Sequence, residues 1–455
     1  MRVPRRPLSS LLSSAVALAA VLGASPAGAP PAAASAASAV QPAESRNMVL
    51  IAHNDLNGSG NLGEGYAEIK TRDGRRVLYA AHESGPRCLS VLDVTDPRAP
   101  GLLGQIDVPG ANTRCNSLDL SGGVLAVANQ VNDETQPGGI TGLRLYDVSG
   151  DPAAPEEIGF FDTSGPFSRG VHYVWFADGR YAHISTGMPD FQPRRPDLDD
   201  QLYVIVDLEN PRRPVEAGRW WWPGTRVGDS APLPTPNAGV DSGCRSHNTD
   251  VFPDRPDRAY VGYIDCGLAV LDISRKNRPR PVALLDDSPP APGFTHTLQP
   301  IRGGRDIVTT HEAVEDNCTD GDKRIDIYRH ASRSTLTRIA TLPAPDNAAE
   351  LCARGGRFGA HNIFERTPDE PTWWSDDVVI GSFFNGGVRA YDVSDPRRPR
   401  EAAYYVPAAP AGSPAGAIQI NDVYVDDRGV IFAGDRFAGG LYVLRSPVID
   451  RAARP

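Results

Sequence analysis

The chain has 455 residues, a formal net charge of −10 and a pI near 5.4. This acidic balance argues against binding to nucleic acids or to anionic lipid, because both need clustered Lys and Arg. The sequence holds 45 Gly and 42 Pro alongside 40% hydrophobic residues, so we expect many turns around a substantial core.

The first 39 residues are predicted to be a secretory signal peptide. A basic start is followed by a mostly apolar stretch over residues 11–22, which is too short to span a bilayer. The basic residues are Arg2, Arg5 and Arg6, and small-residue cleavage sites lie at residues 27–29, 34–36 and 37–39. We therefore expect a secreted, extracellular protein, exported by the general secretory or the twin-arginine route. No later apolar run reaches about 18 residues, so we expect no transmembrane segment in the mature chain.

Six cysteines follow the predicted leader. An even number in an exported chain favours disulfides over free thiols. No CxxC pair occurs, which argues against a cysteine zinc site or a thioredoxin-like redox site. Of the fifteen possible connectivities we expect pairs of sequence neighbours, namely Cys88–Cys115, Cys244–Cys266 and Cys318–Cys352.

One phrase recurs along the rest of the chain, a run of alternating apolar residues that ends in an aspartate and a proline-rich turn. Its copies read LSVLDVTDPRAP from Leu89, LRLYDVSGDPAAP from Leu143, LYVIVDLENPRRP from Leu202, LAVLDISRKNRPRP from Leu268 and VRAYDVSDPRRP from Val388. Two degenerate copies, with Arg329 and Arg445 in the aspartate position, bring the number of units to seven, spaced 53–65 residues apart. This period is typical of one propeller blade with variable loops.

Each unit has room for four short strands. In the third unit, GVHYVWF and RYAHIST precede the phrase and are split by a turn at residues 177–179, and another short strand follows it. The fold class is therefore predicted to be all-β, a seven-bladed β-propeller over residues 47–448. We expect a linker at residues 40–46 and a C-terminal tail at residues 449–455. The last unit lacks its fourth strand, so residues 47–56 are predicted to supply it and close the ring.

The recurring phrase resembles the LVIVD repeat, and the copy that begins at Leu202 is the closest to it. The resemblance covers residues 47–448 and departs in the fifth and seventh units, where the aspartate is replaced. It implies a β-propeller and specifies no reaction, so a function must be argued from the site.

Four consecutive units carry a histidine at the expected start of the innermost strand. These residues are His172, His247, His296 and His361. Imidazoles that converge on the axis suit a transition metal such as Fe, Cu or Zn. Two other interpretations remain open, a structural hydrogen bond within each blade and a polar ligand pocket without a metal. Glu83 and Glu312 share a His-Glu context and are candidate acid/base groups or partners of metal-bound histidines.

Two functions are consistent with these patterns. The first is a secreted, monomeric binding or scaffold protein whose ligand is a small molecule, a glycan or a cell-surface protein. The second is a metal-dependent oxidoreductase that uses the four histidines. The sequence contains no GxSxG, P-loop or HExxH motif that would favour a hydrolase or a nucleotide-binding protein instead.

Overall fold

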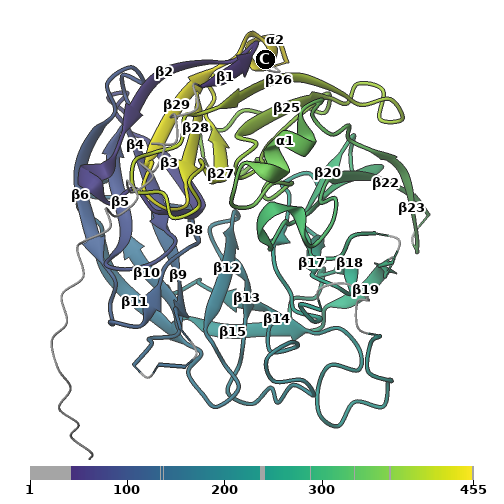
Figure 1. Ribbon diagram of the computed structural model, residues 1–455. Coiled ribbons are helices and arrows are strands. Elements are labelled where there is room, and N and C mark those ends of the chain that lie inside the picture. The colour runs from purple at the N-terminus through teal and green to yellow at the C-terminus, as the bar shows by residue number, and fades with distance from the viewer. Residues whose placement is uncertain are drawn as a thin grey trace, which may run out of the picture. The chain divides into compact units, whose positions relative to one another are not determined.

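The computed structural model describes residues 43–133, 135–136, 138–235, 241–286, 288–289, 291–332, 334–367 and 370–452. The predicted signal peptide lies outside these residues. The described residues belong to one compact unit, in which seven antiparallel sheets follow one another around an axis (Figure 1). The predicted seven-bladed propeller is thereby confirmed.

The first three blades are regular four-stranded sheets, except that two short strands share the inner position of the second. Blade one contains β3 (Leu62–Lys70), β4 (Arg76–His82), β5 (Arg87–Asp93) and β6 (Gly101–Asp107). Blade two contains β7 (Thr113–Arg114), β8 (Leu118–Ser121), β9 (Val124–Val131), β10 (Gly142–Asp147) and β11 (Glu156–Asp162). Blade three contains β12 (Val171–Phe176), β13 (Tyr181–Thr186), β14 (Leu202–Asp207) and β15 (Val215–Trp220).

The next two blades differ in the length of their innermost strand. Blade four begins with the two-residue β16 (Thr249–Asp250) and continues with β17 (Arg258–Tyr263), β18 (Gly267–Asp272) and β19 (Arg280–Leu285). Blade five has the longer β20 (Thr295–Ile301), then β21 (Asp306–His311), β22 (Ile325–Ser332) and β23 (Thr335–Thr341).

The last two blades receive their outermost strands from the first described residues. Blade six contains β24 (Val378–Ser382), β25 (Val388–Asp392) and β26 (Arg400–Val406), with β1 (Glu44–Arg46) at its outer edge. Blade seven contains β27 (Ile420–Val425), β28 (Ile431–Asp435), β29 (Leu441–Arg445) and β2 (Val49–Asn54). The pairing of β2 with β29 confirms the predicted ring closure. The segment expected as a linker contributes β1, which pairs with β26.

Helices are few and short. They are the 3-10 turns η1 (Leu56–Gly58) and η2 (Asp316–Cys318) and the α-helices α1 (Ala348–Ala353) and α2 (Pro447–Ala452). Helix α2 runs into the segment expected as a C-terminal tail. No helix in the described part of the chain is long and apolar enough to cross a membrane.

The repeated aspartate has a local structural role at the end of the third strand of a blade. In five blades its Oδ1 accepts a hydrogen bond from the backbone N–H two residues later, at 2.8–3.0 Å. This contact shapes the tight turn to the outer strand. In the fifth blade Arg329 instead forms an ion pair with Asp306, and in the seventh Arg445 donates to the backbone carbonyl of Arg428. These two contacts join the third strand to the second strand or to the turn that precedes it, and they do not replace the aspartate's bond in the turn to the outer strand. In the seventh blade no such turn is needed, because β2 supplies the outer strand.

Three disulfides join sequence neighbours, as expected. They are Cys88–Cys115, Cys244–Cys266 and Cys318–Cys352, with Cα–Cα distances of 5.0, 5.1 and 5.5 Å. Such bonds fit an extracellular or periplasmic protein, because reducing compartments do not preserve them.

Candidate metal centre

The four predicted histidines lie next to one another near the axis. His172 is on β12 and His296 on β20, whereas His247 and His361 immediately precede the inner-strand positions of blades four and six. Successive ring centroids are 4.4, 3.8 and 4.7 Å apart. All four side chains are buried, and those of His296 and His361 are completely so. The structure thus brings together the residues that the repeat placed in register.

Two buried carboxylates face the last two histidines. Glu64 lies on β3 and Glu312 directly follows β21. His296 Nε2 lies 3.5 Å from Glu64 Oε2 and 3.8 Å from Glu312 Oε2. His361 Nε2 lies 3.6 Å from Glu64 Oε1 and 3.6 Å from Glu312 Oε1. Two imidazoles therefore alternate with two carboxylates around a common centre.

These spacings match those of a metal coordination shell. Zinc is bound by His nitrogen and carboxylate oxygen at about 2.1 Å, so neighbouring ligand atoms of a tetrahedral site lie about 3.4 Å apart. The four nitrogen–oxygen distances of 3.5–3.8 Å are slightly longer than this. A small inward movement of the side chains would complete such a shell.

Hydrogen bonds orient three of the imidazoles so that Nε2 faces the centre. His247 Nδ1 donates to Asn248 Oδ1 at 3.0 Å, and His296 Nδ1 donates to the Thr297 hydroxyl at 2.8 Å. His361 Nδ1 donates to the backbone carbonyl of Asn421 at 2.5 Å. A partner of this kind on the second nitrogen is the usual support of a metal-bound histidine. The Nε2 atoms of His296 and His361 and Glu64 Oε2 are buried without a hydrogen-bond partner, which is costly unless a ligand binds there.

His172 is arranged differently from the other three. Its Nδ1 lies 3.0 Å from both Arg114 Nη2, a donor, and Gln130 Oε1, an acceptor, and its Nε2 is hydrogen-bonded to His247 Nε2 at 2.8 Å. Within the described residues, the groups that could hold a metal are Glu64, His247 and His296, and His296, Glu312 and His361. His172 belongs to neither group and positions His247 instead.

Three arginines cover the cluster and separate it from Glu83. Arg357 Nη1 donates to Glu312 Oε1 at 3.0 Å, and its guanidinium lies over Phe384, which stacks on His361. Glu83 Oε1 accepts from Arg114 at 2.9 Å and from Arg436 at 2.7 Å. Of the two predicted glutamates, Glu312 therefore faces the histidines directly, whereas Glu83 joins the arginine layer.

The electrostatics of the cluster favour charged carboxylates. Burial would raise the pKa of Glu64, but His361 and His296 outweigh it and hold that pKa well below its ordinary value. Burial lowers the pKa of His361, yet Glu312 and Glu64 outweigh it and raise that pKa. Burial lowers the pKa of His247 well below its ordinary value. In the ion-free protein the site therefore binds a proton near His361, which a metal ion would displace.

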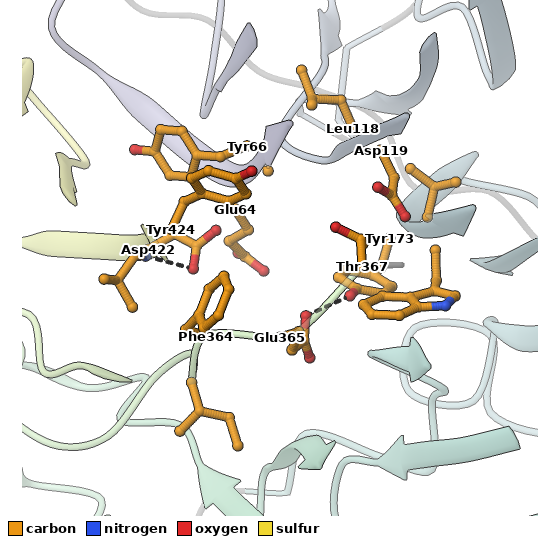
Figure 2. Close-up of a pocket in the computed structure, with 15 residues that line it drawn as sticks. Glu64, Tyr66, Leu118, Asp119, Tyr173, Phe364, Glu365, Thr367, Asp422 and Tyr424 are labelled. Atoms are coloured by element: carbon orange, nitrogen blue, oxygen red, sulfur yellow. Dashed lines mark hydrogen bonds between the residues drawn. The ribbon is translucent and has the colours of Figure 1, made fainter. Parts of the chain in front are cut away.

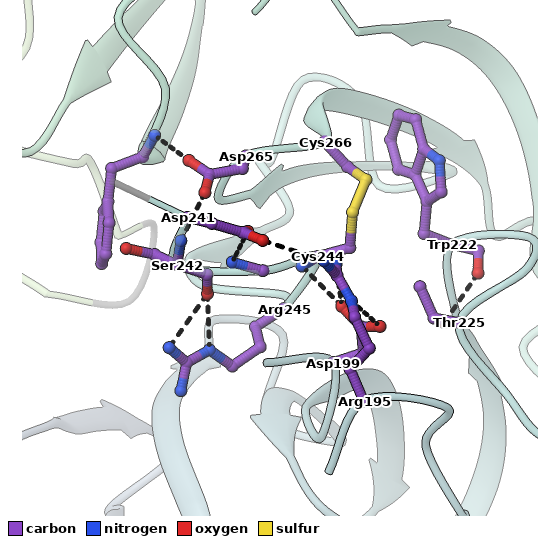
Figure 3. Close-up of a disulfide and its surroundings, with 12 residues drawn as sticks. Arg195, Asp199, Trp222, Thr225, Asp241, Ser242, Cys244, Arg245, Asp265 and Cys266 are labelled. Atoms are coloured by element: carbon purple, nitrogen blue, oxygen red, sulfur yellow. Dashed lines mark hydrogen bonds and ion pairs between the residues drawn. A yellow bond between two sulfur atoms is a disulfide. The ribbon is translucent and has the colours of Figure 1, made fainter. Parts of the chain in front are cut away.

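A disulfide secures the segment that leads to His247. Cys244 lies three residues before this histidine and bonds Cys266 at the β17–β18 turn (Figure 3). The N–H of Cys244 donates to Asp199 Oδ1 at 2.9 Å, and Arg195 pairs with the same carboxylate at 2.7 Å. Because β16 is only two residues long, these cross-links position His247 where the strand itself is short.

Glu64 is the residue of the centre that the sequence prediction missed. When GEGY is aligned with GVHYV on the tyrosine, Gly65 and not Glu64 falls opposite the histidine. The repeat alone therefore did not indicate this acidic side chain, which only the assembled fold places beside the histidines.

The profile of the LVIVD repeat matches residues 257–282, which cover β17, β18 and the start of β19. The protein carries the LVIVD repeat. The matched stretch contains the copy that begins at Leu268 rather than the copy at Leu202. No curated protein matches this LVIVD-repeat propeller significantly.

Solved structures support the fold of the LVIVD-repeat propeller. The periplasmic gluconolactonase of Pseudomonas aeruginosa is 13% identical with a TM-score of 0.53, over 81% of this chain and 93% of the other. The Cps50 (Swd1) propeller domain of Myceliophteria thermophila is 12% identical with a TM-score of 0.46, over 84% and 96%. A putative 6-phosphogluconolactonase from Bacteroides uniformis is 14% identical with a TM-score of 0.46, over 79% and 92%. At these identities only the fold is comparable, and only the first likeness supports it.

Proposed function

We propose that the protein is an exported metal-binding propeller whose transition-metal ion is held by His296, His361, Glu64 and Glu312. The observation that carries the proposal is the pair of buried, unpartnered Nε2 atoms, each 3.5–3.8 Å from both carboxylates. Two nitrogen and two oxygen donors suit Zn²⁺ and Fe²⁺ better than Ca²⁺. When bound, such an ion supplies a Lewis acid for ligands or substrate.

The surrounding residues support a role in binding. The two glutamate ligands would balance the charge of a divalent ion, and Arg357 and Arg436 add positive charge beside it. A small anion is therefore the ligand chemistry that this setting favours. Metal-dependent oxidation of a substrate stays the second candidate function, and a glycan or a cell-surface protein stays a predicted partner.

The test is metal analysis of the purified protein together with titration by Zn²⁺. We expect about one equivalent of bound ion per chain, lost in the His296→Ala/His361→Ala variant. His82→Ala is the matched control, because His82 is equally buried but already bonds Asn61 and Ser90. Thermal unfolding in chelator shows whether each variant folds.

A different result would overturn the assignment. If the wild-type protein took up none of Zn²⁺, Fe²⁺ and Cu²⁺, the cluster would be a metal-free ion-pair network. His361 would then be protonated between two carboxylates. Equal uptake by the double variant and the His82 control would place the metal elsewhere.

A further inference from the structure

A second cluster of carboxyl groups lies further along the inner strands, beyond the histidines. It surrounds a cavity of about 40 Å³ (Figure 2). Four acidic side chains from four blades line this cavity, namely Glu64, Asp119, Glu365 and Asp422. Each of them is at least nine-tenths buried, apart from Glu365, which is partly exposed. Only Glu64 also faces the metal centre.

The cavity lacks the basic residues that balance the metal centre. The described residues that line it include no Lys, Arg or His. One more acid lies directly behind it, because Asp250 shares the hydroxyl of Tyr173 with Glu365, at 2.9 and 2.7 Å. Tyr173 has one proton to donate, so one of these contacts requires a protonated carboxyl. Buried negative charge of this density must be neutralised by protons or by a cation.

The carboxylates are already oriented by donors that leave oxygen lone pairs available. Asp119 accepts backbone N–H bonds from Phe176 at 2.5 Å and Leu120 at 2.8 Å. Asp422 Oδ1 accepts the N–H of Val423 at 2.7 Å. The hydroxyl of Thr367 lines the same cavity and is buried without a hydrogen-bond partner, as is Glu64 Oε2. The unpartnered Thr367 hydroxyl indicates a missing ligand independently of the acidic cluster, whereas Glu64 Oε2 also faces His296 in the metal centre.

Size and donor type define what could bind. A buried water needs about 10–15 Å³, so a cavity of about 40 Å³ holds one inorganic ion and one or two waters. The walls include the aromatic rings of Tyr66, Tyr173 and Trp175, and the acidic side chains project between them. All the ligating atoms are oxygen, which is the preference of hard cations such as Ca²⁺ and Mg²⁺.

We propose that this cavity binds a partly hydrated hard divalent cation through Glu64, Asp119, Glu365 and Asp422. In the described residues, three-ligand groups with atoms within 4.8 Å occur only in the histidine cluster. Two direct ligands of one ion lie at most about 5 Å apart, so in this geometry at most two of the carboxylates bind the ion directly and water bridges it to the others, as is common for Mg²⁺. The propeller then carries two ions of different chemistry on one axis, joined by Glu64.

The test titrates chelator-treated protein with Ca²⁺ and then with Mg²⁺. Ca²⁺ at a hundredfold excess over Kd should raise the Tm by about 4 °C. The Asp422→Asn/Glu365→Gln variant should lose this shift, while the control Asp254→Asn/Glu156→Gln, at two exposed positions, should keep it. The His296→Ala/His361→Ala variant should also keep it, which separates this proposal from the one above.

A second measurement does not depend on stability. Tb³⁺ substitutes for Ca²⁺ and is sensitised by nearby indole, so bound Tb³⁺ should emit through Trp175 and be displaced by Ca²⁺. Trp175→Phe should reduce the emission and leave the Ca²⁺ affinity unchanged within about twofold. The proposal fails if folded wild-type protein binds neither Ca²⁺ nor Mg²⁺, or if the double acid variant binds them as tightly as its control does.

Discussion

The metal centre and the carboxyl-lined cavity occupy the same axis but neutralise their charge in opposite ways. In the centre, Glu312 is paired with Arg357 of the arginine layer, and imidazoles provide neutral donors. In the cavity, acids face acids and aromatic rings, with no basic side chain among the described lining residues. A shift of a few residues along the inner strands therefore changes the available ligand atoms from nitrogen and oxygen to oxygen alone.

The largest effect is expected at Glu64, because it is the only side chain that contributes to both sites. Glu64→Gln keeps the shape but removes the charge, so Zn²⁺ affinity should fall by more than about 100-fold, beyond the range of outer-sphere residues. Ca²⁺ affinity should fall as well. Isothermal titration with each ion measures both losses, and Glu83→Gln is the matched control from the arginine layer. If Glu64→Gln weakened only one ion, the two sites would not share this ligand.

A smaller effect is expected at His172, within the metal centre itself. His172 is hydrogen-bonded to His247, whose ring packs against that of His296, and it is in neither candidate ligand group, so His172→Ala should weaken Zn²⁺ binding only about tenfold. His361→Ala should weaken it much more. The same titration compares the two variants, and equal losses would mean that His172 is a ligand after all.

The smallest effect concerns the pH dependence of stability in chelator. Burial raises the pKa of Asp119 from 3.8 to about 8. A carboxyl whose pKa is raised in the folded state stabilises the protein fully at pH values below about 4, and this contribution is lost as the pH rises towards 8. The Tm of wild-type protein should therefore fall more steeply over this interval than that of Asp119→Asn. Parallel profiles would indicate that Asp119 is already ionised, and added Ca²⁺ should reduce the difference.

Much of this architecture could be predicted because the repeat is strong. The phrase that ends at Asp93, Asp147, Asp207, Asp272 or Asp392 sets the period, and the period aligns the four histidines. The carboxyl-lined cavity could not be found in the same way. Its members occupy different positions in their blades, since Asp119 lies on β8 whereas Glu365 follows an inner segment that forms only an isolated bridge. The burial of these acidic side chains and the absence of basic residues beside them can be seen only when the seven inner strands are assembled.

The sequence also could not show which of the histidines are candidate metal ligands and which are not. GVHYV and GAHNI look equivalent, but Arg114 approaches Nδ1 in the first, and a backbone carbonyl accepts from Nδ1 in the second. The Nε2 of the first is engaged by His247, whereas the Nε2 of the second is buried without a hydrogen-bond partner, so only the second is a candidate ligand.

The strands β1 and β2 have a consequence for how the protein is made. The hydrogen bond from Ser446 Oγ to the carbonyl of Asn47 joins residues 399 positions apart. During synthesis these first strands are complete long before β26 and β29 exist, so their edges stay unpaired while five blades assemble. Contacts of such long range slow folding, and free strand edges invite association with other chains. The interval before the ring closes is therefore when this protein most needs protection by chaperones.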